Sequence, residues 1–182
     1  PQDLLENELF GHVKGGFTGA TEKKEGLFHH SQDGTLFMDE IGEMPLSLQA
    51  KLLRVLEDRK FRRVGATHEE QISARHIVFA TNQDLKQRVD QKQFREDLFF
   101  RINHLEIVIP PLRDRPEDIP CLIEHFCRTH PDTRPMEFSP EAINLLLRYP
   151  WPGNVRELRT VVQRCLVEFH TNKIDANDLC RI

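Results

Sequence analysis

The feature that most limits how this chain can fold is a series of short apolar runs separated by helix-like segments. The runs are TLFMD (35–39), HIVFATN (76–82) and HLEIVIP (104–110), and an amphipathic stretch, SLQAKLLRVLED (47–58), lies between the first two. Short, continuous apolar runs are typical of strands buried on both faces, and such strands occur in parallel sheets covered by helices. The alternation of strands with helices predicts an α/β fold for this part of the chain.

A proline-rich segment divides the chain into two predicted units. PPLRDRPEDIP (110–120) holds four prolines and alternating charges, which is typical of a linker. Beyond it the pattern is helical, with Ser139 as a predicted N-cap and Pro140 in the first turn of a helix. The other helices predicted there are 119–130 and 155–169. We therefore predict an α/β unit over 1–111 and an all-α unit over 112–182.

Composition and charge limit the partners. The chain has 25 Lys and Arg against 29 Asp and Glu, a formal net charge of −4, so it lacks the basic excess of a nucleic-acid-binding domain. No apolar run approaches membrane-spanning length, and no signal peptide is recognisable. We expect a cytoplasmic protein that contacts neither a membrane nor, through this chain alone, DNA.

Four side chains that could bind a metal cluster within ten residues of one predicted helix. They are Cys121, His125, Cys127 and His130. The first two would share one helix face and the last two another, so all four cannot converge on one tetrahedral metal ion. Helix packing and solvent exposure explain them better than a metal site, and the spacing of the cysteines predicts reduced thiols.

Acidic and polar residues end two of the apolar runs. Asp39 and Glu40 close the first run, and Asn82 closes the second. The carboxyl ends of parallel strands meet at one edge of a sheet, where ligands of open α/β sheets bind. In nucleotide hydrolases the first acid of such a pair holds Mg²⁺ and the second polarises the attacking water. As an isolated pattern, an apolar strand that ends in Asp-Glu is more often structural.

Two arginines lie on a short predicted helix further along the chain. FREDLFFR places Arg95 and Arg101 on either side of Asp97. Arginine is suited to stabilising charge on a phosphoryl group during transfer. The alternative is an ordinary surface helix in which one of the arginines pairs with Asp97.

Several longer motifs stand in one order along the chain: ELFGHVKGGFTGA, GTLFMDEIGEMPLSLQAKLLRVLE, FREDLFFRI, PPLRDRPEDI and WPGNVREL. Together they resemble the sigma-54-interacting AAA+ domain of bacterial enhancer-binding proteins, over essentially the whole chain. The resemblance implies an AAA+ parallel sheet with helices, followed by a helical lid. It also implies an activator that uses ATP and Mg²⁺ to remodel sigma-54 RNA polymerase holoenzyme, acting as a homo-oligomeric ring, most often a hexamer in this family.

The resemblance also implies a role for each candidate site residue. Asp39 matches the Walker B acid that holds magnesium, and Glu40 matches the catalytic glutamate. Asn82 falls in the sensor I segment. Arg95 and Arg101 match the two candidate arginine fingers, which reach the nucleotide of a neighbouring subunit.

Two loops and the lid complete the resemblance. GGFTGA matches the loop that contacts sigma-54 in this family, which usually reads GAFTGA, and its residues are Gly15, Gly16, Phe17, Thr18, Gly19 and Ala20. The match implies that Phe17 is exposed because its partner is another protein; the alternative is a ring folded back onto its own domain. The segment from FRRVG to SAR (61–75) resembles the second substrate-facing loop, and Arg156 in WPGNVREL matches the sensor II arginine of the lid.

The phosphate-binding motif of the family does not occur in this sequence. G-x-x-x-x-G-K-[ST] is absent, and no glycine is followed by lysine, so we expect an N-terminally truncated chain. In the family's sheet, with strand order 5-1-4-3-2, the three apolar runs correspond to strands three, four and five. Strands four and five would then lack the neighbour that pairs with both. DNA binding would belong to a module outside this chain, and the alternative function is a sigma-54-interaction fragment that neither binds nor hydrolyses ATP.

Overall fold

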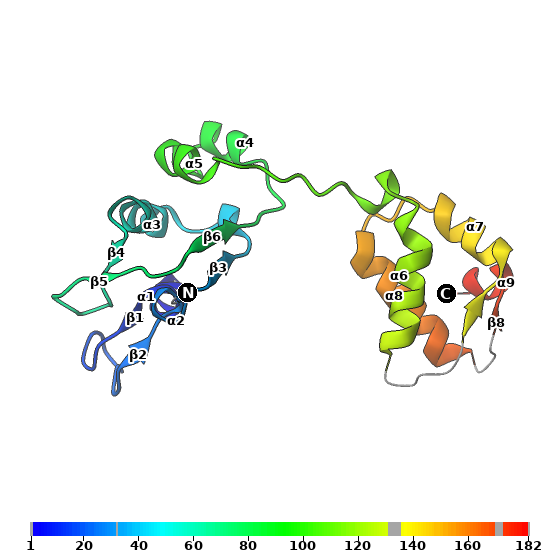
Figure 1. The fold of residues 1–182 in the computed structure, drawn as a ribbon, viewed down its shortest axis with the longest axis horizontal. Coiled ribbons are helices and arrows are strands. Elements are labelled where there is room, and N and C mark those ends of the chain that lie inside the picture. The colour runs from blue at the N-terminus through cyan, green and yellow to red at the C-terminus, as the bar shows by residue number, and fades with distance from the viewer. Residues whose placement is uncertain (1, 32, 131–135, 170–172, 182) are drawn as a thin grey trace. The chain divides into compact units, whose positions relative to one another are not determined.

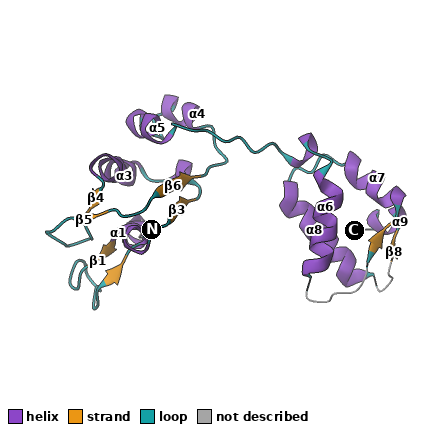
Figure 2. Cartoon of the chain, in the orientation of Figure 1, coloured by secondary structure: helices purple, strands orange, loops and turns teal. Residues whose placement is uncertain are grey.

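The structure is a computed structural model that describes residues 2–31, 33–130, 136–169 and 173–181 (Figure 1). The chain divides into two compact units, Pro1–Glu106 and Ile107–Ile182. The first unit mixes helices with strands, whereas helices dominate the second (Figure 2). Each unit has a hydrophobic core of its own.

The first unit contains both helices and short strands, as the sequence predicts, but four of the short strands are not predicted by it. Its helices are α1 (Gln2–Phe10), α2 (Leu27–His30), α3 (Leu46–Asp58), α4 (Leu85–Asp90) and α5 (Glu96–Ile102), with a 3-10 turn η1 (Ile41–Glu43). Its strands are β1 (Gly11–His12), β2 (Lys24–Glu25), β3 (Thr35–Met38), β4 (Lys60–Phe61), β5 (Glu70–Gln71) and β6 (His76–Phe79). The first two predicted strands and the helix between them are confirmed.

Strands β3 and β6 form a parallel pair in the middle of this unit. Their register runs from Thr35 opposite His76 to Met38 opposite Phe79, so both strands end at the same edge. Alternate side chains of β3, such as Met38, are buried in the core that includes helix α3. On the opposite face, Phe37 is 59% exposed and Val78 is 43% exposed. The prediction that these strands are buried on both faces is therefore wrong, because helices of the described chain pack on one face only.

The third predicted strand, over 104–110, is also wrong. The segment starts in a turn and a bend and belongs to no strand, and Leu105 and Ile107 are 82% and 80% exposed. An apolar run becomes a strand only where a neighbour accepts its backbone hydrogen bonds. Among the described strands, β6 pairs with β3 alone. The physical reason for the error is thus that no described strand pairs with this segment.

The second unit is built mainly from helices around a closed core. Its elements are η2 (Leu112–Asp114), α6 (Asp118–Thr129), β7 (Glu137–Phe138), α7 (Pro140–Arg148), α8 (Asn154–Glu168), β8 (Lys173–Ile174) and α9 (Ala176–Leu179). Ser139 caps α7 by accepting a hydrogen bond from Ala142 N, as predicted. The parallel pair β7–β8 departs from the all-helical prediction. Trp151, 2% exposed, lies in the core and donates its indole N–H to Leu146 O at 2.8 Å.

Candidate functional site

The acidic strand end brings together three of the predicted site residues. Asp39 follows β3 and Asn82 follows β6, and the parallel register places both at one edge. Asn82 Nδ2 donates a hydrogen bond to Glu40 Oε1 at 3.3 Å, and Glu40 N donates to Asp39 Oδ1 at 3.0 Å. Both carboxylates are exposed. The arrangement offers a ligand two acids and an amide at the carboxyl ends of parallel strands.

The backbone at Glu40 is held in an unusual conformation. Its φ of 53° and ψ of 42° lie in the left-handed region, which costs a non-glycine residue about 1–3 kcal/mol. Ile41 N donates to Ala80 O at 3.0 Å, which ties the turn to the end of β6. Strain of this kind persists where the surroundings impose it and is concentrated at functional sites.

Side chains from α4 and the segment before it hold the turn that follows the acids. Arg88 Nη2 donates to Gly42 O at 3.0 Å and forms an ion pair with Glu43 at 3.5 Å. Gln83 also hydrogen-bonds Glu43. A Cβ at Gly42 would lie 2.7 Å from Gln83 Oε1 and 2.8 Å from Thr81 Oγ1, so a larger residue there would displace these two side chains.

The acids fit the way in which Mg²⁺ is bound at nucleotide sites. Among the described residues, no group of three or more His, Cys, Asp or Glu could hold a metal ion, and the four cysteines are free. Mg²⁺ at phosphate sites takes one or two carboxylates and completes its shell with water and substrate phosphates. Asp39, exposed at the strand end, is a suitable single carboxylate for such an ion.

The two predicted arginine fingers lie at the two ends of α5. Arg95 is the N-cap, and its guanidinium forms two hydrogen bonds with the Asp97 carboxylate, at 3.0 and 2.6 Å. The hydrogen bond from Arg95 is the main cause that lowers the pKa of Asp97. Arg101, in the last turn, donates to Leu56 O at 3.0 Å. Both arginines are exposed, and the partners just named, Asp97 and Leu56 O, do not include Asp39 or Glu40.

Arg156 lies in the second unit, in the first turn of α8, and is exposed. The neighbouring residues are well fixed. Asn154 Oδ1 accepts a hydrogen bond from Leu112 N at 2.8 Å, and Glu157 Oε2 accepts one from Gly153 N at 2.8 Å. Its role as a sensor of nucleotide stays a prediction.

The GGFTGA loop connects β1 to β2 and depends on its glycines. Gly15 N donates to Ala20 O at 2.8 Å and closes the loop. Gly15 and Gly19 have φ values of 78° and 100°, which other residues rarely adopt. Phe17 is 42% exposed, and the edge of its ring meets His12 at a centroid distance of 5.0 Å. The ring is therefore neither free in solvent nor buried in its own domain.

A second loop, over 61–75, lies directly against the GGFTGA loop. Val13 N donates to Val64 O at 3.1 Å, and Val64 N donates to Gly11 O at 2.9 Å. A Cβ at Gly16 would lie 2.6 Å from Val64 O, and one at Gly65 would lie 2.4 Å from the Cα of Gly16. The glycine that replaces the family's usual alanine is thus required by the contact between the two loops.

Sequence reasoning missed the ionic cluster beneath these loops. The Arg63 side chain, 4% exposed, binds Glu70 through two hydrogen bonds at 2.5 and 2.9 Å. The hydrogen bond from Arg63 is the main cause that lowers the pKa of Glu70. His29 of α2 lies 3.3 Å from Glu70. Nothing in the alternating charges of FRRV and HEEQ distinguishes these residues from a solvated surface.

Sequence reasoning also missed Gln49, which the buried stripe of α3 could have revealed. Leu52 and Leu56 mark that stripe at helical spacing, and Gln49 falls on the same face. A polar residue at a core position indicates that its side chain forms specific hydrogen bonds, because burial of an amide without partners is costly.

Two family models match this chain and together span almost all of it. The Sigma-54 interaction domain matches residues 1–108, and the AAA+ ATPase lid domain matches residues 113–181. The chain belongs to the sigma-54 interaction domain family. The AAA+ fold class with a lid is confirmed by these matches.

Relatives of this family share about half of their aligned residues with the chain. Regulatory protein AtoC of Escherichia coli (strain K12) is 49% identical over 170 residues, which are 92% of this chain and 37% of AtoC. The DNA-binding transcriptional regulator NtrC of Rhizobium meliloti (strain 1021) is 49% identical over 168 residues, which are 90% of this chain and 34% of NtrC.

Solved structures of a further relative have the same fold. A crystal structure of NtrX from Brucella abortus has a TM-score of 0.84 at 36% identity and covers 92% of this chain and 38% of NtrX. Another, of NtrX in complex with ATP, has a TM-score of 0.84 at 34% identity and covers 97% of this chain and 41% of NtrX. This chain therefore spans well under half the length of the relatives it matches. In the described part of the chain, no helix has the length and apolar character needed to cross a membrane.

Proposed function

We propose that this chain is part of an ATP-dependent transcriptional activator that remodels sigma-54 RNA polymerase holoenzyme, and that it comprises the C-terminal part of the AAA+ core and the lid. In this proposal, residues 1–111 carry the sigma-54 loop, the acids and the arginines, and residues 112–182 form the lid. The single observation that carries the proposal is the hydrogen bond between Asn82 and Glu40 at the edge of parallel strands. The protein would act in the cytoplasm, where RNA polymerase acts.

The acid pair supports hydrolysis of a nucleoside triphosphate. Asp39 would hold Mg²⁺, which when bound neutralises charge on the phosphates. Glu40 would orient and polarise the attacking water. Asn82 donates to Glu40 and so holds its carboxylate at the strand edge. ATP is the proposed nucleotide, and the ATP complex of NtrX supports this choice.

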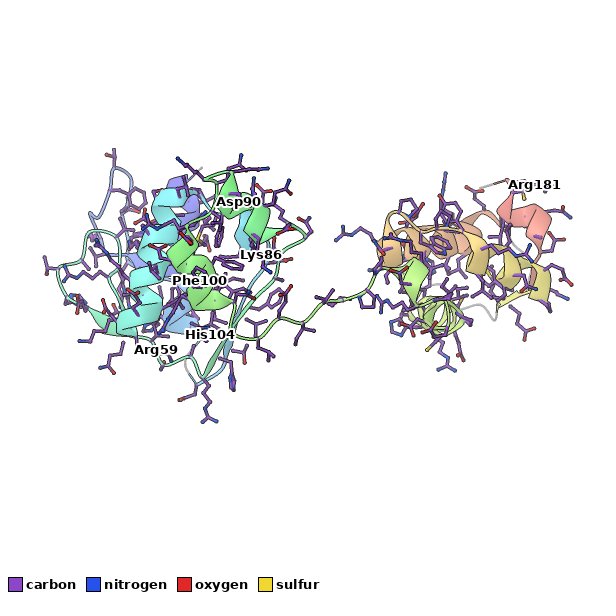
Figure 3. All side chains as sticks on the ribbon, turned by 90° about the horizontal axis from the view of Figure 1, so that it is seen from above. Arg59, Lys86, Asp90, Phe100, His104 and Arg181 are labelled. Atoms are coloured by element: carbon purple, nitrogen blue, oxygen red, sulfur yellow. The ribbon has the colours of Figure 1, made fainter. Side chains whose placement is uncertain are left out.

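The exposed arginines support action between subunits of a ring. Arg95 and Arg101 are exposed. Phe100, labelled in Figure 3, lies on the same helix and is 66% exposed. Cationic groups beside an exposed aromatic ring suit a contact with another protein surface. A neighbouring subunit's nucleotide would then receive the arginines, most simply in a homo-oligomeric ring.

The GGFTGA loop supports contact with sigma-54. Its tip presents Phe17 and Thr18 to solvent, and the Phe17 ring is supported from behind by His12. A partly exposed aromatic ring on a glycine loop can be transferred to a protein partner without disturbing the core. In this proposal, conformational changes at Asp39 and Glu40 during hydrolysis would be passed to sigma-54 through this loop.

Glu40→Ala in the whole protein tests the hydrolytic role. We expect ATP turnover to fall by about 10²–10⁴-fold with little change in ATP affinity, because Glu40 acts on the transition state. Glu57→Ala, at an exposed position of α3, is the matched control and should leave turnover unchanged. Steady-state turnover and equilibrium nucleotide binding are measured on each form, and undiminished turnover in Glu40→Ala would exclude the role.

The alternative function is sigma-54 interaction without ATP binding by this chain. The absence of G-x-x-x-x-G-K-[ST] from the sequence favours it. The P-loop backbone and its lysine supply most of the phosphate affinity at such sites, whereas two carboxylates repel a triphosphate. Isothermal titration of this chain with magnesium-ATP should show no micromolar binding. Micromolar affinity would show that the chain contains another phosphate site and would exclude the alternative.

A further inference from the structure

Helix α3 has one fully buried polar side chain, the amide of Gln49. Its exposure is 0%, and it lies among apolar residues of the same stripe, including Leu48 and Leu52. An amide in such a place is tolerated only when its donors and acceptor are paired. The partners of Gln49 therefore show what the residue does.

Gln49 pairs with two separate segments of the chain. Its Nε2 donates to Met44 O at 2.7 Å and to Gln93 O at 3.2 Å. Its Oε1 accepts a hydrogen bond from Arg95 N at 2.8 Å. Met44 ends the turn that begins at Glu40, and Arg95 is the N-cap of α5. One side chain thus links the turn after the acids to the start of the helix that carries the arginines.

The segment before α5 is fixed at several points. Phe94, 2% exposed, is anchored in the core between the two backbone groups that Gln49 binds. Arg88 O accepts hydrogen bonds from Gln93 N at 2.9 Å and Phe94 N at 3.1 Å, while the Arg88 guanidinium binds Gly42 O. A second, parallel connection therefore joins the same two segments. Helix α5 begins from a backbone whose position depends on the turn after the acids.

We propose that Gln49 is a positioning residue that holds the start of α5 in place and so sets where Arg95 and Arg101 are presented to a neighbouring subunit. The inference rests on the proposed function, because it concerns arginines that act on another subunit's nucleotide. The Gln49 amide is fully buried, so we assign it no direct contact with the nucleotide. It acts by hydrogen-bonding the backbone of residues 93–95, and its bond to Met44 O ties it to the turn after the acids.

The three hydrogen bonds of Gln49, which we call the clamp, are tested by hydrogen exchange of the whole protein without nucleotide. Gln49→Met keeps the length of the side chain and removes the amide. We expect the Arg95 amide to exchange about fivefold faster, since it loses a hydrogen bond of ordinary strength. Leu52→Ala, at a site that is 0% exposed on the same helix, is the control for general loosening of the core. An Arg95 amide that accelerates in Gln49→Met no more than the other amides of the first unit do, which is the pattern expected for general loosening in Leu52→Ala, would overturn the clamp.

Turnover of the whole protein tests whether the clamp serves the arginines. A misplacement of about 1 Å can cost about 10²-fold in rate, so Gln49→Met should lower turnover by about 10- to 100-fold with nearly unchanged ATP affinity. Leu52→Ala should lower the free energy of unfolding, but it should lower the turnover less than Gln49→Met does. Equal turnover in Gln49→Met and wild type would overturn the inference. Absence of turnover in wild type would instead overturn the proposed function, and the exchange experiment would still decide the clamp.

Mixed rings show on which side of a subunit interface Gln49 acts. Gln49→Met subunits have intact acids, and Glu40→Ala subunits have correctly placed arginines, so their mixture should regain turnover at mixed interfaces. A mixture of Gln49→Met with Arg101→Ala should not, because neither partner supplies a competent arginine. The opposite pattern would show that Gln49 acts through its own acid pair. Failure of both mixtures, with mixed rings verified, would equally contradict the assignment.

Discussion

The turn after Asp39 and Glu40 is held by side chains in addition to backbone bonds, whereas the bonds described for the GGFTGA loop are all backbone bonds. At the acid edge, amide and guanidinium groups bind backbone oxygens, as in the bonds from Arg88 to Gly42 O and from Gln49 to Met44 O. At the loop, Val13 and Val64 exchange backbone hydrogen bonds with the opposite segment. Side-chain bonds fix a precise geometry for chemistry, and backbone bonds leave the loop's side chains available to a partner.

The two regions also use the left-handed backbone conformation differently. At the acid edge a charged residue, Glu40, has a φ of 53°, which stores strain where its surroundings hold it. In the loop, Gly15 and Gly19 reach φ values of 78° and 100° without steric strain. The acid edge is therefore suited to one fixed geometry, and the loop is suited to changing shape.

In the proposed ring, the largest effect is expected where the arginines of one subunit would reach the acid edge of the next. Arg101→Ala in the whole protein should lower ATP turnover by about 10³–10⁵-fold, because an arginine supplied by a neighbour stabilises charge in phosphoryl transfer. Mixing Arg101→Ala with Glu40→Ala should restore part of the turnover at mixed interfaces. Arg54→Ala, on the exposed side of α3, is the control. Verified mixed rings that stay inactive would argue against action across the interface.

The sequence correctly predicted those elements whose local residue pattern agrees with the pairing that they have in the folded structure. The strand that ends in Asp39 and the amphipathic helix α3 follow from their own residues. The run over 104–110 has an equally apolar pattern, yet Ile107 is 80% exposed, because a strand depends on a partner that its own sequence does not contain. The exposed Phe37 reflects the same limit, since which faces of a sheet are covered depends on other elements.

Sequence predicted the candidate site to a similar extent. The strand ends implied that Asp39, Glu40 and Asn82 share an edge, and the parallel register brings them together. The hydrogen bonds of Gln49 join residues distant in sequence, so no local pattern specifies them. The contact of Gly16 with Val64 likewise depends on how two loops meet.

An intermediate effect is expected at the tip of the loop. Phe17→Ala should weaken binding to sigma-54 by about 2–4 kcal/mol, the range for a central aromatic contact, and should leave basal ATP turnover unchanged. Leu27→Ala is a matched control, because Leu27 is 43% exposed and Phe17 is 42% exposed. Binding is measured by titration with purified sigma-54. A Phe17 variant that binds as well as wild type would remove the ring from the interface and leave the loop without its proposed role.

The smallest effect is expected where the two loops touch. Gly16→Ala restores the residue that the family usually has, but its Cβ would lie 2.6 Å from Val64 O, a backbone atom that cannot rotate away. Overpacking of this kind costs about 1–3 kcal/mol, here by separating the loops, so the Val64 amide, bonded to Gly11 O at 2.9 Å, should exchange faster. Gly19→Ala is the control, because nothing lies within 4 Å of its Cβ and only the φ of 100° opposes it. It should lower the stability without exposing Val64. If the Val64 amide were equally protected in the Gly16 variant and in wild type, the loop would adjust to alanine without separating from the second loop. The contact between the two loops would then not depend on the glycine, which would contradict the contrast drawn with the acid edge.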